Sequence, residues 1–294
     1  MHKYLRAVGF SCINSRKDIQ NIIVKGIGSS TDRAYTTIEN DVLYGEYNAF
    51  FGDRIGLCIR GEYTEDSKFI FDYYFPFLQG KGDSTYEDIS VERQFEKLAF
   101  AGIVDDDRIG ISIIFYVQNI IRYLKLLHTD SLPIKGTTLT LQGLSVAGTI
   151  LLPIDKDETQ IRKANNYNLR KSRMLAEARK GNEKAIENLT IQEMDTYTVV
   201  HKKVQNEDVY SVVDTYCMPY GVECDLYSIL GEITSFDKVV NTYTQENVYI
   251  LTLNVNDIIM DVCINELDLL GEPEIGRRFK GVIWLQGRIN YPES

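Results

Sequence analysis

Residues 155–203 read DKDETQIRKANNYNLRKSRMLAEARKGNEKAIENLTIQEMDTYTVVHKK. The stretch is highly charged. Projected at about 100° per residue, its apolar residues Ala164, Tyr167, Met174, Leu175 and Ala178 fall on one side of a helix. This spacing predicts a helix over 159–180 with Gly181 as its C-terminal stop, followed by shorter helices over 183–188 and 190–203. Both flanking regions read as β-rich, so the helical stretch divides the chain.

The predicted fold class is α+β, with two mainly antiparallel β-rich modules joined by the charged helical segment. We assign residues 1–154 to an N-terminal α+β module, 155–205 to a helical connector and 206–294 to a C-terminal β-rich module. Antiparallel pairing is expected because hairpin-length links dominate and regular alternation of strand and helix is absent. For the C-terminal module, a small oligonucleotide/oligosaccharide-binding (OB-type) barrel is one candidate among several.

Local patterns predict the elements within the modules. Ser15 to Asp18 forms a capping box that opens a short helix, with Ile19, Ile22 and Ile23 on one face. Gly52-Asp53 separates two β-prone runs and fits a tight hairpin with glycine first. The other predicted strands cover residues 42–51, 55–63, 68–75, 109–117, 137–152, 209–218, 227–240, 248–255, 258–264 and 280–289, the other predicted helices cover 91–101 and 118–128, and 269–276 is expected to be a loop.

Charge and cysteine content limit the environment of the protein. The net charge is −10 over 294 residues, and residues 201–294 account for −8 of it. This balance argues against bulk electrostatic binding to nucleic acid or to anionic membranes. There are five cysteines and no CxxC motif, and the first residues lack the apolar core of a signal peptide. We therefore expect a cytoplasmic protein that does not enter a membrane.

No cluster of residues matches a catalytic, cofactor-binding or metal-binding motif, so we predict none of these sites. Asp105-Asp106-Asp107 lacks the register of a calcium loop and is expected to form a solvated turn. The three histidines, His2, His128 and His201, have no nucleophile motif beside them, and surface or helix-capping roles are expected. Paired carboxylates among Asp214, Glu223, Asp225 and Glu232 leave open a hydrolase with a carboxylate site.

Arginine clusters are the candidate contacts with an anion or a partner. Arg170 and Arg173 belong to a basic arc of the 159–180 helix, for which docking to the acidic module or solvation is the competing interpretation. Arg277 and Arg278 follow Gly276, where backbone amides and two guanidinium groups would suit a phosphate or carboxylate. Near them, Trp284 and Tyr291 with Lys280 and Arg288 could form a basic stacking surface for single strands, although core packing of Trp284 is the competing interpretation.

A weak internal similarity recurs in the chain. Leu-Gln-Gly occurs at residues 78–80, 141–143 and 285–287, without the steady period that would indicate a repeat architecture.

Three segments carry a resemblance to a known family: MHKYLRAVGF (1–10), YCMPYGVE (216–223) and LLGEPEIGRRFKGVIWLQG (269–287). Through them the chain resembles an uncharacterised domain family of anaerobic Gram-positive, Clostridia-type bacteria. The resemblance implies a cytoplasmic bacterial protein. It transfers no catalytic or binding residue.

The function expected from these observations is a non-enzymatic cytoplasmic interaction or binding protein with a protein partner or self-association. Two alternatives stay open at this point. One is a nucleic-acid-binding protein that uses the basic helix and a barrel surface, and the other is the carboxylate hydrolase.

Overall fold

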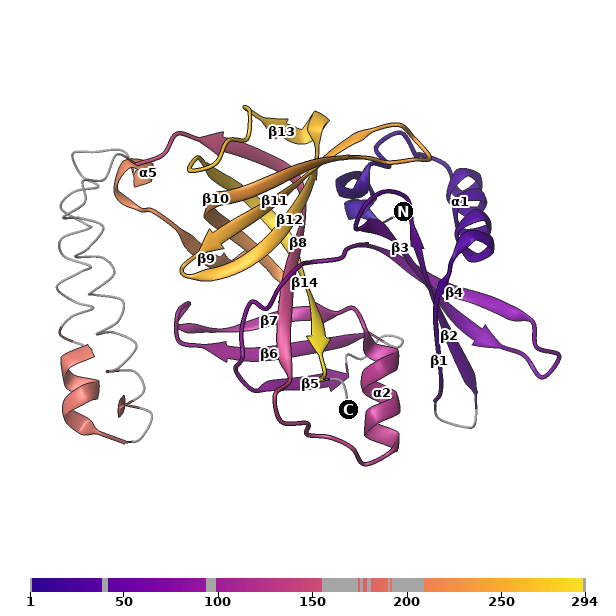
Figure 1. The fold of residues 1–294 in the computed structure, drawn as a ribbon, viewed down its shortest axis with the longest axis horizontal. Helices are drawn as coiled ribbons and strands as arrows, with labels where there is room; N and C mark the ends of the chain where they lie inside the picture. Colours follow the sequence, from indigo (N-terminus) through magenta and orange to yellow (C-terminus); the bar gives the residue numbers. More distant parts are fainter. Residues whose placement is uncertain are drawn as a thin grey trace.

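The computed structural model of the chain describes residues 2–38, 42–93, 99–154, 174, 177–178, 181–189, 191 and 209–292. The strands form two sheets (Figure 1). One has four strands, and the other has ten, of which five close into a barrel. Among the described residues the helices are few and short, so the fold is α+β with a predominance of strand.

The N-terminal part combines two short helical elements with the four-stranded sheet. The 3-10 helix η1 (Lys3–Val8) precedes α1 (Arg16–Ser29), whose N-cap Ser15 accepts a hydrogen bond from the Asp18 N–H as the capping box predicts. Ile22 is fully buried, and α1 covers the sheet through β2 and β3. The sheet is antiparallel in the order β1 (Asp32–Thr37), β2 (Leu43–Phe50), β3 (Ile55–Tyr63) and β4 (Phe69–Leu78).

The β2–β3 hairpin is confirmed, but its turn differs from the prediction. The residue with positive φ is Arg54, at 65°, and not Gly52. Glycine is required at position 52 because a Cβ there would lie 2.9 Å from the Val240 carbonyl oxygen. The glycine therefore serves a close approach between the hairpin and a strand of the other sheet.

The prediction of a helix over 91–101 is wrong where the structure describes these residues. They belong to the antiparallel meander of β5 (Ile89–Arg93), β6 (Phe100–Asp106) and β7 (Ile111–Val117), which α2 (Ile120–His128) follows. Val91 is the cross-strand partner of Gly102, so ladder hydrogen bonds and sheet packing override a helical spacing of apolar residues. Residues 94–98 lie outside the described part of the chain.

Five strands close the barrel in the order β8, β12, β11, β10 and β14 (Figure 1). β8 (Thr138–Leu151) pairs in parallel with β12 (Ile258–Asn265) and antiparallel with β14 (Arg278–Asn290). β10 (Leu226–Val240) and β11 (Asn247–Val255) complete the circle. The interior is apolar and includes Leu141, Ile229, Leu253, Val262, Phe279 and Leu285.

This pairing distributes the chain differently from the division proposed at residues 154 and 206. β8 precedes the connector, yet it completes a barrel whose other strands follow the connector. β14 also pairs in parallel with β7, which joins the meander to the barrel in one sheet. A strand from the first half of the chain is thus required to close the second.

Short elements complete the described chain. The strand predicted over 209–218 is wrong in its first part, because α5 (Val209–Val212) precedes β9 (Tyr216–Pro219). β13 (Leu269–Leu270) occupies the start of the region expected to be a loop, directly after η3 (Glu266–Asp268). Residues 183–189 are helical and Gly181 has a φ of 83°, as predicted; most of the 159–180 and 190–203 helices fall outside the described residues. No helix in the described chain is both long and apolar enough to cross a bilayer.

Candidate functional site

A cavity of about 150 Å³ lies between the four-stranded sheet and the region where β14 passes α2. One wall comes from β1, β2 and β3, and the opposite wall from the start of α2 and the end of β14. Most of the lining side chains are polar or charged, around an apolar floor: Asp32, Ala34, Glu46, Asn48, Phe50, Cys58, Phe75, Phe77, Gln79, Gln118, Asn119, Arg122 and Arg288. A concave site in which polar groups converge beside an apolar surface is a candidate ligand site, although this lining is more polar than that of most ligand pockets.

A buried ion pair supports the sheet side of the cavity. Arg60 is fully buried, and its Nε donates to Glu46 Oε2 at 2.7 Å. Nη1 donates to the Tyr73 hydroxyl at 2.7 Å, and Nη2 donates to the Gln118 carbonyl oxygen at 2.6 Å. The guanidinium also lies 4.8 Å from the centre of the Phe75 ring. Because the cation has partners on all sides, it fixes Glu46 and links β3 to the chain before α2.

The groups that could act as nucleophiles in this region are held in their protonated forms. Burial raises the pKa of the Cys58 thiol well above its ordinary value, with Glu46 as a further cause. Burial also raises the pKa of the Tyr116 hydroxyl, more strongly than the neighbouring Arg60 lowers it. A protonated thiol is a poor nucleophile, so Cys58 is not activated for covalent chemistry.

Arg288 is a lining cation that has no hydrogen-bond or ion-pair partner among the described residues. Trp284, Gln286, Arg288 and Asn290 lie two residues apart along β14 and share one face. Trp284 donates to Asp225, Gln286 to the Pro76 carbonyl oxygen, and Asn290 to Thr140. Arg288 is half-buried in the same row, and its guanidinium makes no hydrogen bond or ion pair within the described chain. The five N–H donors of the Arg288 guanidinium thus have no acceptor within the described chain.

α2 places a second arginine on the same wall. The Asn119 side chain donates to the Ile289 carbonyl oxygen at 2.8 Å and accepts from the Ile289 N–H at 3.1 Å, which fixes the start of α2 against β14. Arg122 follows within the first turn of the helix and lies 5.4 Å from the centre of the Tyr291 ring. The aromatic face orients this cation without neutralising it.

The opposite wall carries carboxylates. The Asn48 amide donates to Asp32 Oδ2 at 3.1 Å and to Glu46 Oε1 at 3.3 Å, and therefore spaces the two acids. Asp32 has no cationic partner in the part of the chain that the structure describes. The cavity thus has cations on the barrel side and an acidic edge on the sheet side.

A buried polar seam continues from this cavity between the two sheets, and the three Leu-Gln-Gly segments meet in it. Gln142 and Gln286 are cross-strand partners in β8 and β14. A Cβ on Gly80 would lie 2.7 Å from Gln142 Oε1. Gln118 donates to Gln286 Oε1 at 2.6 Å. The recurrence seen in the sequence therefore marks one junction between the sheets and not a repeat.

A second ion pair anchors the far end of the seam. Arg54 and Asp261 form a buried ion pair, and the other Asp261 oxygen accepts from Thr252 at 2.7 Å. Asp261 also accepts from the Lys81 N–H at 2.9 Å. These bonds hold the end of the four-stranded sheet against the outer surface of the barrel.

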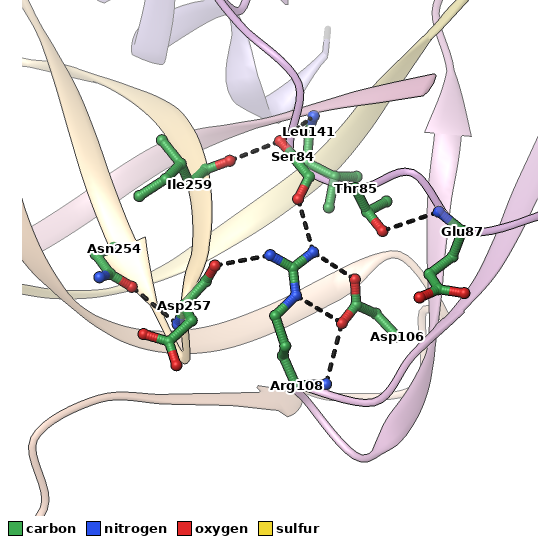
Figure 2. Close-up of polar contacts among 9 residues, drawn as sticks. All are labelled: Ser84, Thr85, Glu87, Asp106, Arg108, Leu141, Asn254, Asp257 and Ile259. Carbon is green, nitrogen blue, oxygen red and sulfur yellow. Dashed lines mark hydrogen bonds and ion pairs between the residues drawn. The ribbon is translucent and has the colours of Figure 1, made fainter. Parts of the chain in front are cut away.

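The Asp105-Asp106-Asp107 cluster has a structural role that the sequence did not suggest (Figure 2). Arg108 donates to both Asp106 carboxylate oxygens and to the carbonyl oxygens of Ser84 and Asp257. Burial alone would raise the pKa of Asp106, but hydrogen bonds from Arg108 and Thr85 hold it below its ordinary value. The cluster ties the β6–β7 turn to the barrel, and the described residues contain no group of ligands able to hold a metal ion.

Arg277 and Arg278, the two described members of the four arginines proposed as anion or partner contacts, do not line the cavity. Arg277 forms an ion pair with Glu274 at 2.8 Å and donates to the Glu272 carbonyl oxygen. Arg278 is buried and donates to the carbonyl oxygens of Leu152, Val213 and Tyr210, so its donors are used within the chain. Arg170 and Arg173 lie outside the described residues.

The carboxylates considered for a hydrolase are also separated from the cavity. Asp225 accepts from the indole of Trp284 at 2.7 Å, and burial raises its pKa above the ordinary value. Asp214, Glu223 and Glu232 do not line it either. Trp284 is packed against Tyr4 at 5.5 Å between ring centres, as the core-packing interpretation predicts.

The two histidines that the structure describes lie at the ends of helical elements. His128 is in the last turn of α2, and His201 lies outside the described residues. The His2 Nδ1 accepts the Tyr4 N–H at 3.3 Å, at the start of η1, and the imidazole lies against Trp284. Burial, with a contribution from the amino terminus, lowers the pKa of His2 from 6.5 to about 4.

This pKa predicts a pH dependence of stability. The unfolded chain binds a proton at His2 below pH 6.5, whereas the folded chain binds it only near pH 4, so stability should fall as the pH falls between these values. Replacement His2→Asn keeps an acceptor for the cap and does not titrate. We expect it to flatten the pH profile by roughly 2 kcal/mol between pH 7 and pH 4, measured by urea unfolding. Profiles that run parallel for the two proteins would contradict the assignment.

Comparison with known proteins places the chain in a family. Residues 5–287 match the family model described as "Domain of unknown function, E. rectale Gene description (DUF3881)". The chain belongs to this family. Searches of curated proteins and of solved structures give no match. The resemblance to an uncharacterised family is therefore confirmed. The description of the DUF3881 family names no activity.

Sequence reasoning missed most of the cavity. The sequence suggests Arg288 only as part of a stacking surface around Trp284. It gives no reason to select four other residues of this region as site residues: Glu46, Arg60, Gln118 and Arg122. The one sequence feature that could have indicated Glu46 and Arg60 is a charged residue within an otherwise apolar strand pattern. In the structure the two residues are cross-strand partners in β2 and β3. A charged residue in a strand that is otherwise buried requires a partner, but the sequence does not say which one.

Proposed function

We propose that the protein is a non-enzymatic binding protein for a small anionic molecule that occupies the cavity between the four-stranded sheet and the barrel. The observation that carries the proposal is Arg288, a half-buried guanidinium with no partner in the described chain, next to a second cation, Arg122, on the same wall. A guanidinium that is partly removed from water and left unpaired costs free energy. An anionic ligand that accepts its hydrogen bonds removes that cost.

The size of the cavity limits the ligand. A cavity of about 150 Å³ is comparable to one that holds a benzene molecule. Sites for drug-sized ligands and cofactors are roughly 300–1,000 Å³. We therefore infer a small ligand, and not a nucleotide cofactor.

The connectivity of the barrel gives a second reason to place the ligand in this cavity and not on the usual binding face of the barrel. β10, β11 and β12 form a meander, and β14 and β8 complete the circle. We infer an OB-type barrel in which β8 takes the place of the last OB strand, although it comes first in the chain. OB barrels bind ligands on the face of their second and third strands, here β11 and β12. On that face Val248, Ile250 and Cys263 are buried in the cluster that includes η1, so the usual surface is covered.

The proposal is tested by thermal unfolding with small anions. We expect acetate, succinate or inorganic phosphate at 10 mM, compared with chloride at equal ionic strength, to raise the melting temperature. An anion present at about 100 times its dissociation constant stabilises by about 2.7 kcal/mol, which is roughly 5 °C for a protein of this size. Arg288→Ala should abolish the shift.

Arg16→Ala is the matched control, because Arg16 is exposed on α1 and its removal changes the net charge equally. It should retain the full shift. If none of the anions stabilises the protein, or if Arg288→Ala responds as the control does, the proposal is wrong.

Nucleic-acid binding through Arg170 and Arg173 stays a prediction, since both residues lie outside the described chain. The barrel-surface form of that alternative loses support, because Trp284 is packed and Arg278 donates to carbonyl oxygens. We retain the cytoplasm as the proposed location, supported by five free thiols, and cell fractionation tests it.

A further inference from the structure

We infer that the ligand of the cavity is an acidic α-amino acid, an inference that rests on the function proposed above. The cavity carries charges of both signs on opposite walls. Arg122 and Arg288 lie on the barrel side, and Asp32 and Glu46 lie on the sheet side. A ligand with only negative charge would match one wall and face uncompensated acid on the other.

The charged groups of the cavity that have no charged partner in the described chain narrow the choice of ligand. Glu46 is neutralised by Arg60, with which it forms a buried ion pair at 2.7 Å. Asp32 receives a hydrogen bond from the neutral Asn48 amide only, and it has no cation beside it in the described chain. Two cations and one carboxylate are therefore left to contact a ligand. Two carboxylates and one ammonium group are the complementary set, and an acidic α-amino acid carries them.

The floor of the cavity fits the remainder of such a molecule. Phe50 and Phe77 meet edge to face at 5.2 Å between ring centres, and they give a surface for methylene groups. Glutamate has ten non-hydrogen atoms and is far smaller than the ligands of drug-sized or cofactor sites. Arg288 and Arg122 would then bind the two carboxylates, and Asp32 would accept from the ammonium group.

Isothermal titration calorimetry with three ligands tests this assignment. L-Glutamate carries all three charges, glutarate lacks the ammonium group, and L-2-aminobutyrate lacks the second carboxylate. We expect L-glutamate to bind about tenfold more tightly than either analogue, because each missing group leaves one charged wall without its hydrogen bonds. Asp32→Asn should remove the preference for L-glutamate over glutarate and leave glutarate binding unweakened.

Asp66→Asn is the control, since Asp66 is exposed in the turn between β3 and β4 and has the same charge. It should keep the preference. Equal binding of glutarate and L-glutamate, or a preference that survives Asp32→Asn, overturns the amino-acid assignment and leaves the anion site in place. Absence of binding by all three ligands, together with absence of stabilisation by the anions of the thermal assay, overturns both proposals.

Discussion

Replacement of Arg60 by methionine is expected to lower the free energy of unfolding by about 3–5 kcal/mol, the cost of removing one partner from a buried ion pair. Arg60 is fully buried, and Glu46 beside it is 3% exposed. Without the guanidinium, the Glu46 carboxylate keeps only neutral partners, the Asn48 amide and the Cys58 thiol, among the described residues, and the Gln118 carbonyl oxygen loses its donor. The chain would then have to bury a charge that nothing compensates.

A double-mutant cycle separates this effect from lost packing. Glu46→Gln removes the charge at almost constant shape, so Arg60→Met with Glu46→Gln should be more stable than the sum of the single losses predicts. Because a proton also neutralises the stranded carboxylate, the loss in Arg60→Met should shrink as the pH is lowered from 7.5 to 5. Urea unfolding can be followed by the fluorescence of Trp284, the single tryptophan. Strictly additive losses, with no dependence on pH, would show that the ion pair is not what fixes this side of the cavity.

Elements held together by neighbouring residues could be predicted from the sequence. The capping box at Ser15, the β2–β3 hairpin and the strands β10, β11 and β12 are all present. In each case a cap, a turn or a short link sets the structure within about ten residues. Where a local pattern fits both a helix and a strand, the prediction was wrong. Val91 has helical spacing with its neighbours, but it lies in a strand because it pairs with Gly102.

Barrel closure and the cavity depend on contacts that no local pattern encodes. β8 pairs with β14 across more than a hundred residues, and the order of strands in a sheet is not readable from their sequences. The cavity likewise combines residues of β1, β2, α2 and β14. Arg277 and Arg278 are the more obvious local cluster in the sequence. The role proposed for Arg288 depends instead on its having no partner in the described chain while its neighbours along β14 have theirs.

Replacement of Gly287 by alanine is expected to destabilise the protein by about 3 kcal/mol or more, at the upper end of overpacking effects. A Cβ at this position would lie 2.2 Å from Cδ2 of the Phe115 ring. The ring also lies close against Gly102, the cross-strand partner of Phe115 on β6, since a Cβ built there would lie 2.2 Å from it. The Gly102 backbone therefore leaves the ring little room to move away from β14. Phe115 is fully buried between the two glycines, and it lies on β7, where the meander joins the barrel.

The mechanism predicts a specific rescue. Phe115→Leu alone should cost about 1–2 kcal/mol through lost packing. In that background Gly287→Ala should cost much less than in the natural chain, because the ring that collides with the new methyl group is gone. Gly28→Ala is the control: no atom lies within 4 Å of its Cβ position in α1, and alanine favours a helix, so we expect a gain of up to about 1 kcal/mol. If Gly287→Ala unfolds at the urea concentration of the natural chain, or costs the same with leucine at 115, the two glycines do not confine the ring, and the join between the meander and the barrel must be held by its few ladder hydrogen bonds alone.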